Sequence, residues 1–198
     1  MDALLEDVPD RVETDRLILR SARASDAGAL NAAVRESLAD LQVSMPWAQA
    51  EPSLARSEAD CRRMQAQFLL REHLPMFMFE RRADGAEGGF IGGTGLHRID
   101  WTLRRFEVGY WCRSSQQRRG FVTEAVHALT RFAFEHLKAR RVEVRMDDTN
   151  ERSWQVAQRV GFALEGVLRS DSLTPKGEPR DTRVYARVIG AGAAAAST

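Results

Sequence analysis

One stretch of the chain, from Arg105 to Leu137, constrains the fold more than any other, because its pattern changes from strand to helix across a basic glycine turn. Residues 106–112 are rich in aromatic and β-branched side chains, which is typical of a strand. After the turn, apolar residues recur at steps of three and four and so predict one buried helix face; they are Val122, Val126, Leu129, Phe132, Ala133 and Leu137. The stretch therefore predicts a strand, a turn and a helix in direct succession.

The turn itself, Arg118-Arg-Gly120, has the properties of an anion site. The first N–H groups of a helix have no acceptor inside the helix, and the helix dipole favours negative charge at that end. The two arginines add positive charge beside these N–H groups. We therefore predict that the turn binds a phosphate or pyrophosphate group.

Composition restricts the class of protein. The 198 residues, 43% of them hydrophobic, suit one domain with a sizeable core, and the net charge of +1 predicts neither nucleic-acid nor membrane binding. The two cysteines, Cys61 and Cys112, provide no disulfide framework, which is typical of a reducing cytoplasm. No apolar run approaches the ~20 residues that span a bilayer, and the N-terminus has no signal-peptide pattern. We expect a cytoplasmic protein.

Several motifs of other enzyme classes are missing from the sequence. Residues 89–98 form a glycine-rich strand pattern, but neither GxGxxG nor GxxxxGK[ST] occurs, which argues against a dinucleotide loop or a P-loop. Glycines within a strand more often mark a bulge or a close approach of another backbone or a ligand. The histidines at 73, 127 and 136 have no metal-ligand spacing with the cysteines, and HExxH is absent, so no metal site is predicted.

One loop and five further ordered blocks resemble the GNAT acetyltransferases, in particular the branch that acetylates the N-termini of ribosomal proteins. The family's pyrophosphate loop, Q/R-x-x-G-x-G/A, is matched by Gln117-Arg-Arg-Gly120-Phe-Val122. The other blocks occur in family order: Gly92-Gly-Thr-Gly-Leu-His97, Ile99-Asp-Trp101, Glu107-Val-Gly-Tyr-Trp111, Asn150-Glu-Arg-Ser153, and Gly161-Phe162 with Glu165-Gly166. The resemblance covers about residues 13–188. One departure is Val122, where the family usually has Gly or Ala; a β-branched side chain there predicts looser or slightly displaced cofactor binding.

Both the resemblance and the alternation of predicted elements imply one α+β domain. We expect a GNAT-like, mixed, mostly antiparallel central sheet of about seven strands, flanked by about four helices. The domain is expected over residues 11–189, between a flexible leader at 1–10 and a flexible tail at 190–198. Residues 12–20 read as one strand with Leu17 and Leu19 on one face, and a polar loop at 170–180 separates two final strands at 162–168 and 182–189.

Helix starts are predicted from capping residues. Ser25-Asp26 begins a helix to about Leu41, and Ser53 or Ser57 begins another to about Glu72. A last helix starts at Asn150 or Ser153 and ends at Gly161.

The resemblance implies acetyl-CoA as the cofactor, with its pantetheine between two strands that splay apart, here 106–112 and 140–146. The residues expected to contact it are Tyr110, Trp111, Cys112, Gln117, Arg118, Arg119, Gly120, Phe121, Val122, Thr123 and Asn150. Ser153 occupies the position of a hydroxyl that protonates the departing thiolate; the alternative is an ordinary serine at a helix start. Cys112 is expected to be a small apolar residue and not a nucleophile, because direct transfer needs no covalent enzyme intermediate.

The acceptor must attack the thioester as a neutral amine. At pH 7, an α-amino group with a pKa of about 7.8 costs about 1 kcal/mol to deprotonate, whereas a lysine with a pKa of about 10.4 costs about 4.6 kcal/mol. Glu107 is the first candidate for a general base, and the alternative is that it pairs with Arg104 or Arg105 at the surface. The other residues expected on the acceptor side are Trp47 (which otherwise packs under a loop), His97, Asp100 and Asp171, the second candidate base.

These observations predict an acetyl-CoA-dependent N-acetyltransferase whose acceptor is the N-terminal α-amine of a (ribosomal) protein, by direct attack on the thioester. Two alternatives stay open: a small amine acceptor such as a polyamine, an amino acid or an aminoglycoside, and a non-catalytic CoA-binding module. An acidic acceptor cleft would favour a polyamine or an aminoglycoside, and a peptide-sized groove would favour a protein N-terminus. An exposed apolar face on the second helix or the last strands would indicate a homodimer.

Overall fold

The computed structural model describes residues 2–174 and 176–189. Eight strands in this part of the chain form one sheet in the order β1-β2-β3-β4-β5-β6-β8-β7, where only β5 and β6 run parallel. The strands are β1 Arg11–Glu13, β2 Leu17–Ser21, β3 Leu74–Arg81, β4 Glu87–Asp100, β5 Arg105–Cys112, β6 Arg141–Asp147, β7 Ala163–Leu173 and β8 Pro179–Val188. The α-helices are α1 Ala27–Ser44, α2 Leu54–Leu69, α3 Phe121–Glu135 and α4 Glu151–Arg159. The expected α+β architecture is confirmed, with eight strands in place of about seven.

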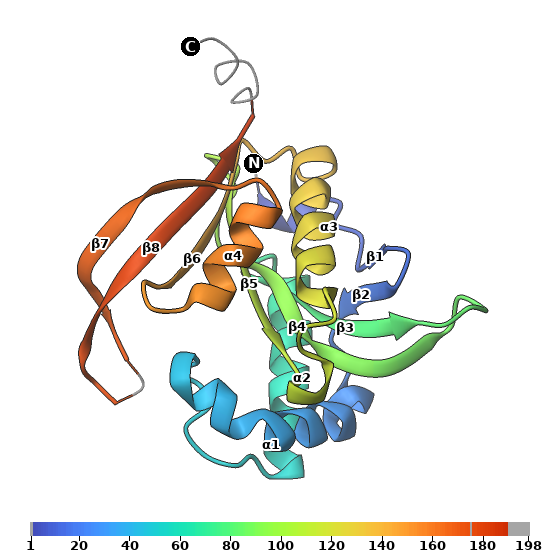
Figure 1. Cartoon of the computed structure of the whole chain (residues 1–198). Coiled ribbons are helices and arrows are strands. Elements are labelled where there is room, and N and C mark those ends of the chain that lie inside the picture. Colours follow the sequence, from blue (N-terminus) through green and yellow to red (C-terminus); the bar gives the residue numbers. More distant parts are fainter. Residues whose placement is uncertain (1, 175, 190–198) are drawn as a thin grey trace.

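Helices cover both faces of the sheet (Figure 1). On β3, Met76 and Met78 join the larger core under α3 and α4, whereas Phe77 and Phe79 join a second core under α1. Strand β2 alternates in the same way, and all five of its residues are buried. Leu17 and Leu19 therefore do share one face, as predicted. No helix within the described residues is long and apolar enough to cross a membrane.

Two of the predicted helix starts are confirmed by their caps, whereas Asp26 precedes α1 without a side-chain capping bond to that helix, because its carboxylate binds Arg20 and Arg23 N–H. The Ser53 hydroxyl accepts a hydrogen bond from Arg56 N–H at the start of α2. At the start of α4, the Asn150 side chain accepts one from Ser153 N–H, so the helix begins after Asn150 and not at Ser153. Gly161 follows the helix with a φ of 84°, a left-handed conformation that glycine adopts without strain.

The single strand expected at residues 12–20 is wrong, because a turn at residues 14–16 divides it into β1 and β2. Thr14 N–H donates to Leu17 O at 2.9 Å, and Leu17 N–H donates to the Thr14 hydroxyl at 2.8 Å. That hydroxyl also lies 2.6 Å from Oε1 of Glu124 on α3. The contact between Thr14 and Glu124 therefore helps to fix this turn, which contains neither glycine nor proline and so is not recognisable from the sequence.

The polar loop expected at 170–180 is also mostly strand. β7 continues to Leu173 and β8 begins at Pro179. Polar side chains pair across these strands: Ser172 Oγ lies 3.2 Å from Thr182 Oγ1 and accepts from Arg180 Nε at 2.9 Å. Cross-strand pairs of this kind stabilise a hairpin without an apolar face.

The segment expected to be a flexible leader is described from Asp2, and it packs against the domain. Val8 is buried in the larger core, and the Glu6 carboxylate lies 2.7 Å from the Arg104 guanidinium. The tail expected at 190–198 lies outside the described residues.

Candidate active site

The site begins where two neighbouring strands separate. β5 and β6 pair only between residues 105–107 and 141–143, although both strands continue for several more residues. Beyond that point they border a cavity of about 1040 Å³, whose lining includes residues 108–111 of β5 and 144–147 of β6. A strand edge left unpaired in this way can hydrogen-bond another extended chain. The geometry is the one that the sequence resemblance implies for pantetheine.

The basic glycine turn follows β5 and leads into α3. Gly120 caps the helix with a φ of 81°, which glycine adopts far more readily than other residues. The backbone N–H groups from Arg118 to Thr123 have no acceptor within residues 2–174 and 176–189; the first that has one is Glu124 N–H, which donates to Gly120 O at 3.1 Å. Unsatisfied N–H groups at a helix N-terminus are suited to binding an anion.

An open depression of about 460 Å³ lies beside the turn. It is lined by Gly120 and Thr123, with side chains from the β1–β2 turn, α3 and α4; these are Arg16, Glu124, His127, Arg159 and Val160. The Arg16 guanidinium donates to Arg119 O at 3.1 Å and so braces the turn from outside. Arg16 is also paired with Glu124 at 2.6 Å, so this arginine holds the turn in place, and among the described residues the free positive charge beside the N–H groups comes from the arginines of the turn itself.

The side chains of the turn differ in where they lie. Gln117 donates to Asp40 Oδ2 on α1 at 3.1 Å, and the Arg119 guanidinium lies 4.8 Å from the ring centre of buried Phe121. Val122 is partly buried and packs against the larger core. The Val122 side chain therefore packs against the core and not over the N–H groups, although valine departs from the family pattern at this position.

Tyr110 and Ser153 meet across the gap between the separated strands. The Tyr110 phenolic oxygen lies 2.9 Å from Ser153 Oγ and 3.1 Å from Ser153 O. Ser153 N–H donates to Asn150 Oδ1 at 3.1 Å, and all three residues line the large cavity. Burial raises the pKa of Tyr110 to about 12, so its phenol stays protonated at neutral pH. The sequence places all three residues in the site, but nothing in it signals the Tyr110–Ser153 contact.

Cys112 ends β5 and packs against the larger core without lining the cavity. Burial raises the pKa of its thiol to about 11, so almost no thiolate is present at pH 7. These surroundings support the expectation that Cys112 is not a nucleophile.

Two rings lie over glycines in the acceptor side of the cavity. His97 lies over Gly109, where an added Cβ would come within 2.9 Å of its ring; Trp111 lies over Gly93 in the same way. Trp47 is 54% exposed, lines the cavity and contacts Trp111 edge-on, with ring centres 6.0 Å apart. Burial, with a contribution from nearby His73, lowers the pKa of His97 to about 4, so the imidazole is neutral at pH 7.

The acidic residues expected on the acceptor side occupy different places. Glu107 is the cross-strand neighbour of His97 and lies 3.5 Å from Arg98 Nε, but it does not line the cavity. Burial raises the pKa of Glu107, and its Oε2 is buried without a hydrogen-bond partner. In contrast, a hydrogen bond from Thr182 and the Arg145 guanidinium lower the pKa of Asp171, which also lies outside the lining. The raised pKa favours Glu107 over Asp171 as a base.

Asp100 is the last residue of β4, and its Oδ1 accepts from Leu103 N–H at 2.8 Å in the turn that follows. It does not line the cavity. Its position is that of a residue that stabilises a turn.

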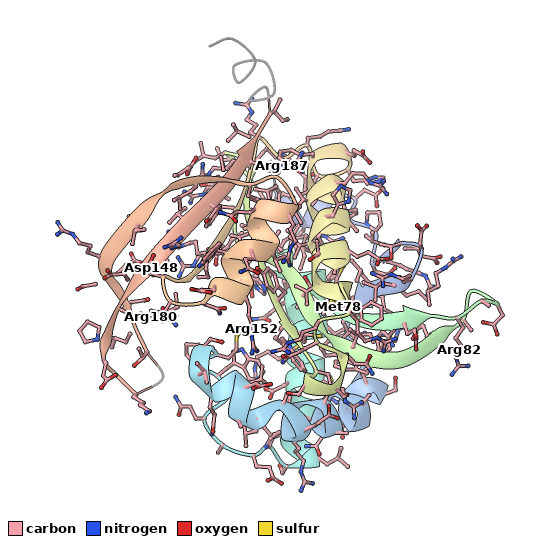
Figure 2. The ribbon with its side chains drawn as sticks, in the orientation of Figure 1. Met78, Arg82, Asp148, Arg152, Arg180 and Arg187 are labelled. Carbon is pink, nitrogen blue, oxygen red and sulfur yellow. The ribbon has the colours of Figure 1, made fainter. Side chains whose placement is uncertain are left out.

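Apart from Trp47, the far wall of the cavity is a part of the site that sequence reasoning missed. It consists of the segment between α1 and α2, side chains of α2, and Arg180 of β8. Figure 2 shows Arg180 on the β7–β8 hairpin and Arg152 at the end of α4 nearest α1. Each of the three lining carboxylates is paired with an arginine: Glu51 with Arg35 at 2.5 Å, Asp60 with Arg56 at 3.0 Å, and Asp147 with Arg180 at 3.6 Å.

A family model described as acetyltransferase (GNAT) domain matches residues 16–163, which include the separated strands and the glycine turn. The chain belongs to the GNAT acetyltransferase family. This GNAT enzyme is 32% identical over 152 residues to the ribosomal-protein-serine acetyltransferase of Escherichia coli, an alignment that covers 75% of this chain and 79% of that protein. YdaF of Bacillus subtilis is 35% identical over 99 residues, or 50% of this chain, and the chain spans only 54% of that protein's length.

Solved GNAT structures extend the comparison to the fold. RimL, a ribosomal L7/L12 alpha-N-protein acetyltransferase in complex with coenzyme A, superposes with a TM-score of 0.76 at 26% identity over 90% of this chain and 98% of that chain. The microcin C7 self immunity acetyltransferase MccE, in complex with acetyl-CoA and AMP, gives 0.82 at 22% identity over 92% and 98%, which is a likeness of fold. This GNAT enzyme is therefore an acetyl-CoA-dependent N-acetyltransferase, and the free N–H groups from Arg118 to Thr123 and the gap between β5 and β6 fit that cofactor.

Proposed function

We propose that the enzyme acetylates the N-terminal α-amine of a protein, with a ribosomal protein as the expected acceptor, by direct attack on the thioester. The relative in Escherichia coli and RimL are both named for ribosomal-protein acetylation, which supports this choice. The observation that carries it is the charge of the acceptor cavity. This cavity is large enough for several residues of a peptide and offers no spare negative charge.

Four arginines line the cavity: Arg56, Arg63, Arg145 and Arg180. Three carboxylates also line it, and each is paired with an arginine: Asp60 and Asp147 with two of these four, and Glu51 with Arg35 outside the lining. A polyamine or an aminoglycoside carries several positive charges and needs unpaired carboxylates to bind. The cavity therefore disfavours both acceptors. The N-terminus of a protein carries a single amine, which can enter the cavity in its neutral form.

The inner end of the cavity favours a neutral amine. His97 is neutral at pH 7, and Glu107 does not line the cavity, so neither side chain places a negative charge against an ammonium ion there. Releasing the amine proton to bulk water costs about 1 kcal/mol for an α-amine and about 4.6 kcal/mol for a lysine. The site therefore selects the α-amine by about 3.5 kcal/mol before any other contact. Because Glu107 does not line the cavity, it takes the proton released during attack through water or through His97.

The other end of the site holds the cofactor. Bound acetyl-CoA supplies an activated acetyl thioester. The N–H groups from Arg118 to Thr123 bind its pyrophosphate, and the unpaired edges of β5 and β6 hold its pantetheine. Ser153 lines the cavity and would donate a hydrogen bond to the departing sulfur. Trp47 and His97 position the acceptor.

The test is a CoA-release screen with acetyl-CoA and matched acceptors. We expect turnover with peptides that begin with Ala, Ser or Thr, and none with the same peptides acetylated at the N-terminus and carrying a free lysine. Spermidine and an aminoglycoside are the comparison acceptors. Faster turnover of either polycation would refute the proposal. If the protein binds CoA but acetylates none of these amines, the result would support the alternative hypothesis of a non-catalytic CoA-binding module.

A further inference from the structure

Tyr110 makes an unusual connection inside this site. Its ring comes from β5, yet its hydroxyl contacts the first turn of α4, on the far side of the gap between β5 and β6. The side chain is partly buried against the larger core and lines the cavity. The phenol therefore joins the two walls of the gap at Ser153, the residue that the proposed function assigns to the departing sulfur.

The number of protons restricts how this contact works. A phenol has one proton and a serine hydroxyl has one, whereas the Ser153 carbonyl only accepts. The Tyr110 oxygen lies within hydrogen-bond distance of both Ser153 oxygens, at 2.9 Å and 3.1 Å. If the phenol donates to Ser153 Oγ, the serine proton is left free to point into the cavity, whereas a phenol that donates to the carbonyl leaves Ser153 Oγ as the donor between the two hydroxyls. Because burial raises the pKa of Tyr110 to about 12, the phenol keeps this proton wherever the acceptor amine is neutral.

Ser153 is too weak an acid to give its proton away. Hydroxyls of this kind are about as weakly acidic as water, whereas a thiol has a pKa of about 8.5. A complete transfer of the proton from serine to a thiolate would therefore be strongly uphill. A hydrogen bond from the serine stabilises the thiolate without this transfer, and solvent supplies the proton that forms the thiol.

We propose that Tyr110 is a positioning residue that holds Ser153 as a hydrogen-bond donor toward the sulfur of coenzyme A and so stabilises its thiolate. The C–S bond breaks with both electrons on sulfur, the attacking nitrogen loses its proton to Glu107 or water, and Ser153 keeps its own. Hydrogen bonds in a chain polarise one another, so donation from the phenol also strengthens donation by Ser153. This inference rests on the role of Ser153 in the proposed function.

The experiment uses coenzyme A without any acceptor, so it is independent of which amine is acetylated. The thiol pKa of bound coenzyme A is measured from its binding affinity by calorimetry between about pH 6 and pH 9.5. We expect the wild-type protein to lower this pKa. Tyr110→Phe keeps the ring, removes one hydroxyl, and raises the pKa of the bound thiol by about one unit, a tenfold change in the thiolate fraction. Ser153→Ala raises it at least as much.

The second tyrosine provides a matched control, since the chain has only two. Tyr185 is buried and its hydroxyl accepts from Gln158 of α4 at 3.3 Å, so Tyr185→Phe removes the same atom beside the same helix. We expect no shift in the thiol pKa for this variant. At pH 6, where the thiol is protonated, Tyr185→Phe binds coenzyme A within about twofold of wild type, and a cooperative thermal unfolding transition verifies that each variant folds.

The double variant decides whether Tyr110 acts through Ser153. Tyr110→Phe combined with Ser153→Ala matches Ser153→Ala alone if the phenol only positions the serine. Additive shifts, or no shift for Tyr110→Phe, would overturn the inference. A larger shift for Tyr110→Phe than for Ser153→Ala would also overturn it, because the phenol would then contact the sulfur directly. If the peptide screen fails while these shifts appear, only the choice of acceptor is wrong.

Discussion

The two halves of the site are built differently. The cofactor half consists of residues near one another in the sequence: β5, the glycine turn and the start of α3, joined by α4 through Tyr110 and Ser153. The acceptor half combines the segment between α1 and α2, His97 of β4 and Arg180 of β8. Side chains in the first half are hydrogen-bonded to the backbone around them, whereas Trp47 in the second is more than half exposed.

This difference indicates that the first half serves cofactor binding and acetyl transfer, whereas the second half determines which acceptor binds. The cofactor is the same molecule for every member of the family, so a compact local unit can bind it. The acceptor half faces whatever amine the enzyme modifies, and segments on its rim can change without disturbing the strands beneath. Substitutions in the first half should therefore change cofactor binding, and substitutions in the second should change acceptor binding or pH dependence.

The largest effect is expected from Gly120→Val in the cofactor half. A β-branched residue at a φ of 81° is strained, and relief of the strain would turn the N–H groups away from the pyrophosphate. We expect coenzyme A to bind roughly 30- to 100-fold more weakly by calorimetry, which is about 2–3 kcal/mol. Gly177→Val is the control, because its φ is 84° but it lies in the β7–β8 turn. Equal losses in both variants would show general destabilisation.

His97 should make stability depend on pH in the acceptor half. Its pKa in the folded state is about 4, below the ordinary value of 6.5, so the unfolded chain binds the extra proton and stability is lost as pH falls through this window. Between pH 7.5 and pH 5 the loss is about 2 kcal/mol. Because the raised pKa of Glu107 acts in the opposite sense, the measurement is the difference between wild type and His97→Asn in urea unfolding at both pH values. Identical pH dependence in the two proteins would contradict it.

Gly109→Ala should affect the acceptor more than the cofactor. The new Cβ would come within 2.9 Å of the His97 ring and push it into the cavity. We expect the KM for an acceptor peptide to rise about tenfold, or about 1.4 kcal/mol, with coenzyme A affinity changed less than threefold. Gly89→Ala is the matched control, since nothing lies within 4 Å of a Cβ at that position. A loss confined to coenzyme A affinity would place Gly109 in the cofactor half.

The smallest effect is expected from Val122→Ala. The sequence pattern predicts that this side chain crowds the phosphates, so that its removal would tighten binding. In the structure it packs against the larger core. We therefore expect coenzyme A affinity to stay within about twofold and stability to fall by about 1 kcal/mol. Calorimetry that shows much tighter binding would restore the crowding hypothesis.

The sequence alone was sufficient for the elements whose signals are local. The change of period around Gly120, the cap at Ser53 and the alternation of Leu17 and Leu19 all depend on neighbouring residues. The turn at Thr14 was missed because Glu124, 110 residues away, helps to fix it. The pairing of Tyr110 with Ser153 and the arginines of the far wall were missed for the same reason, since they depend on packing between distant segments.

The separation of β5 from β6 leaves part of the sheet without its own partner strand. Main-chain amides from Val108 to Cys112 that point into the gap are exposed until an extended molecule lies beside them. In the proposed binding mode, acetyl-CoA would be a structural component as well as a substrate, because its pantetheine would complete the hydrogen bonding of the strands in the middle of the sheet. Hydrogen–deuterium exchange of these amides should slow when the nucleotide binds, and the melting temperature should rise with its concentration.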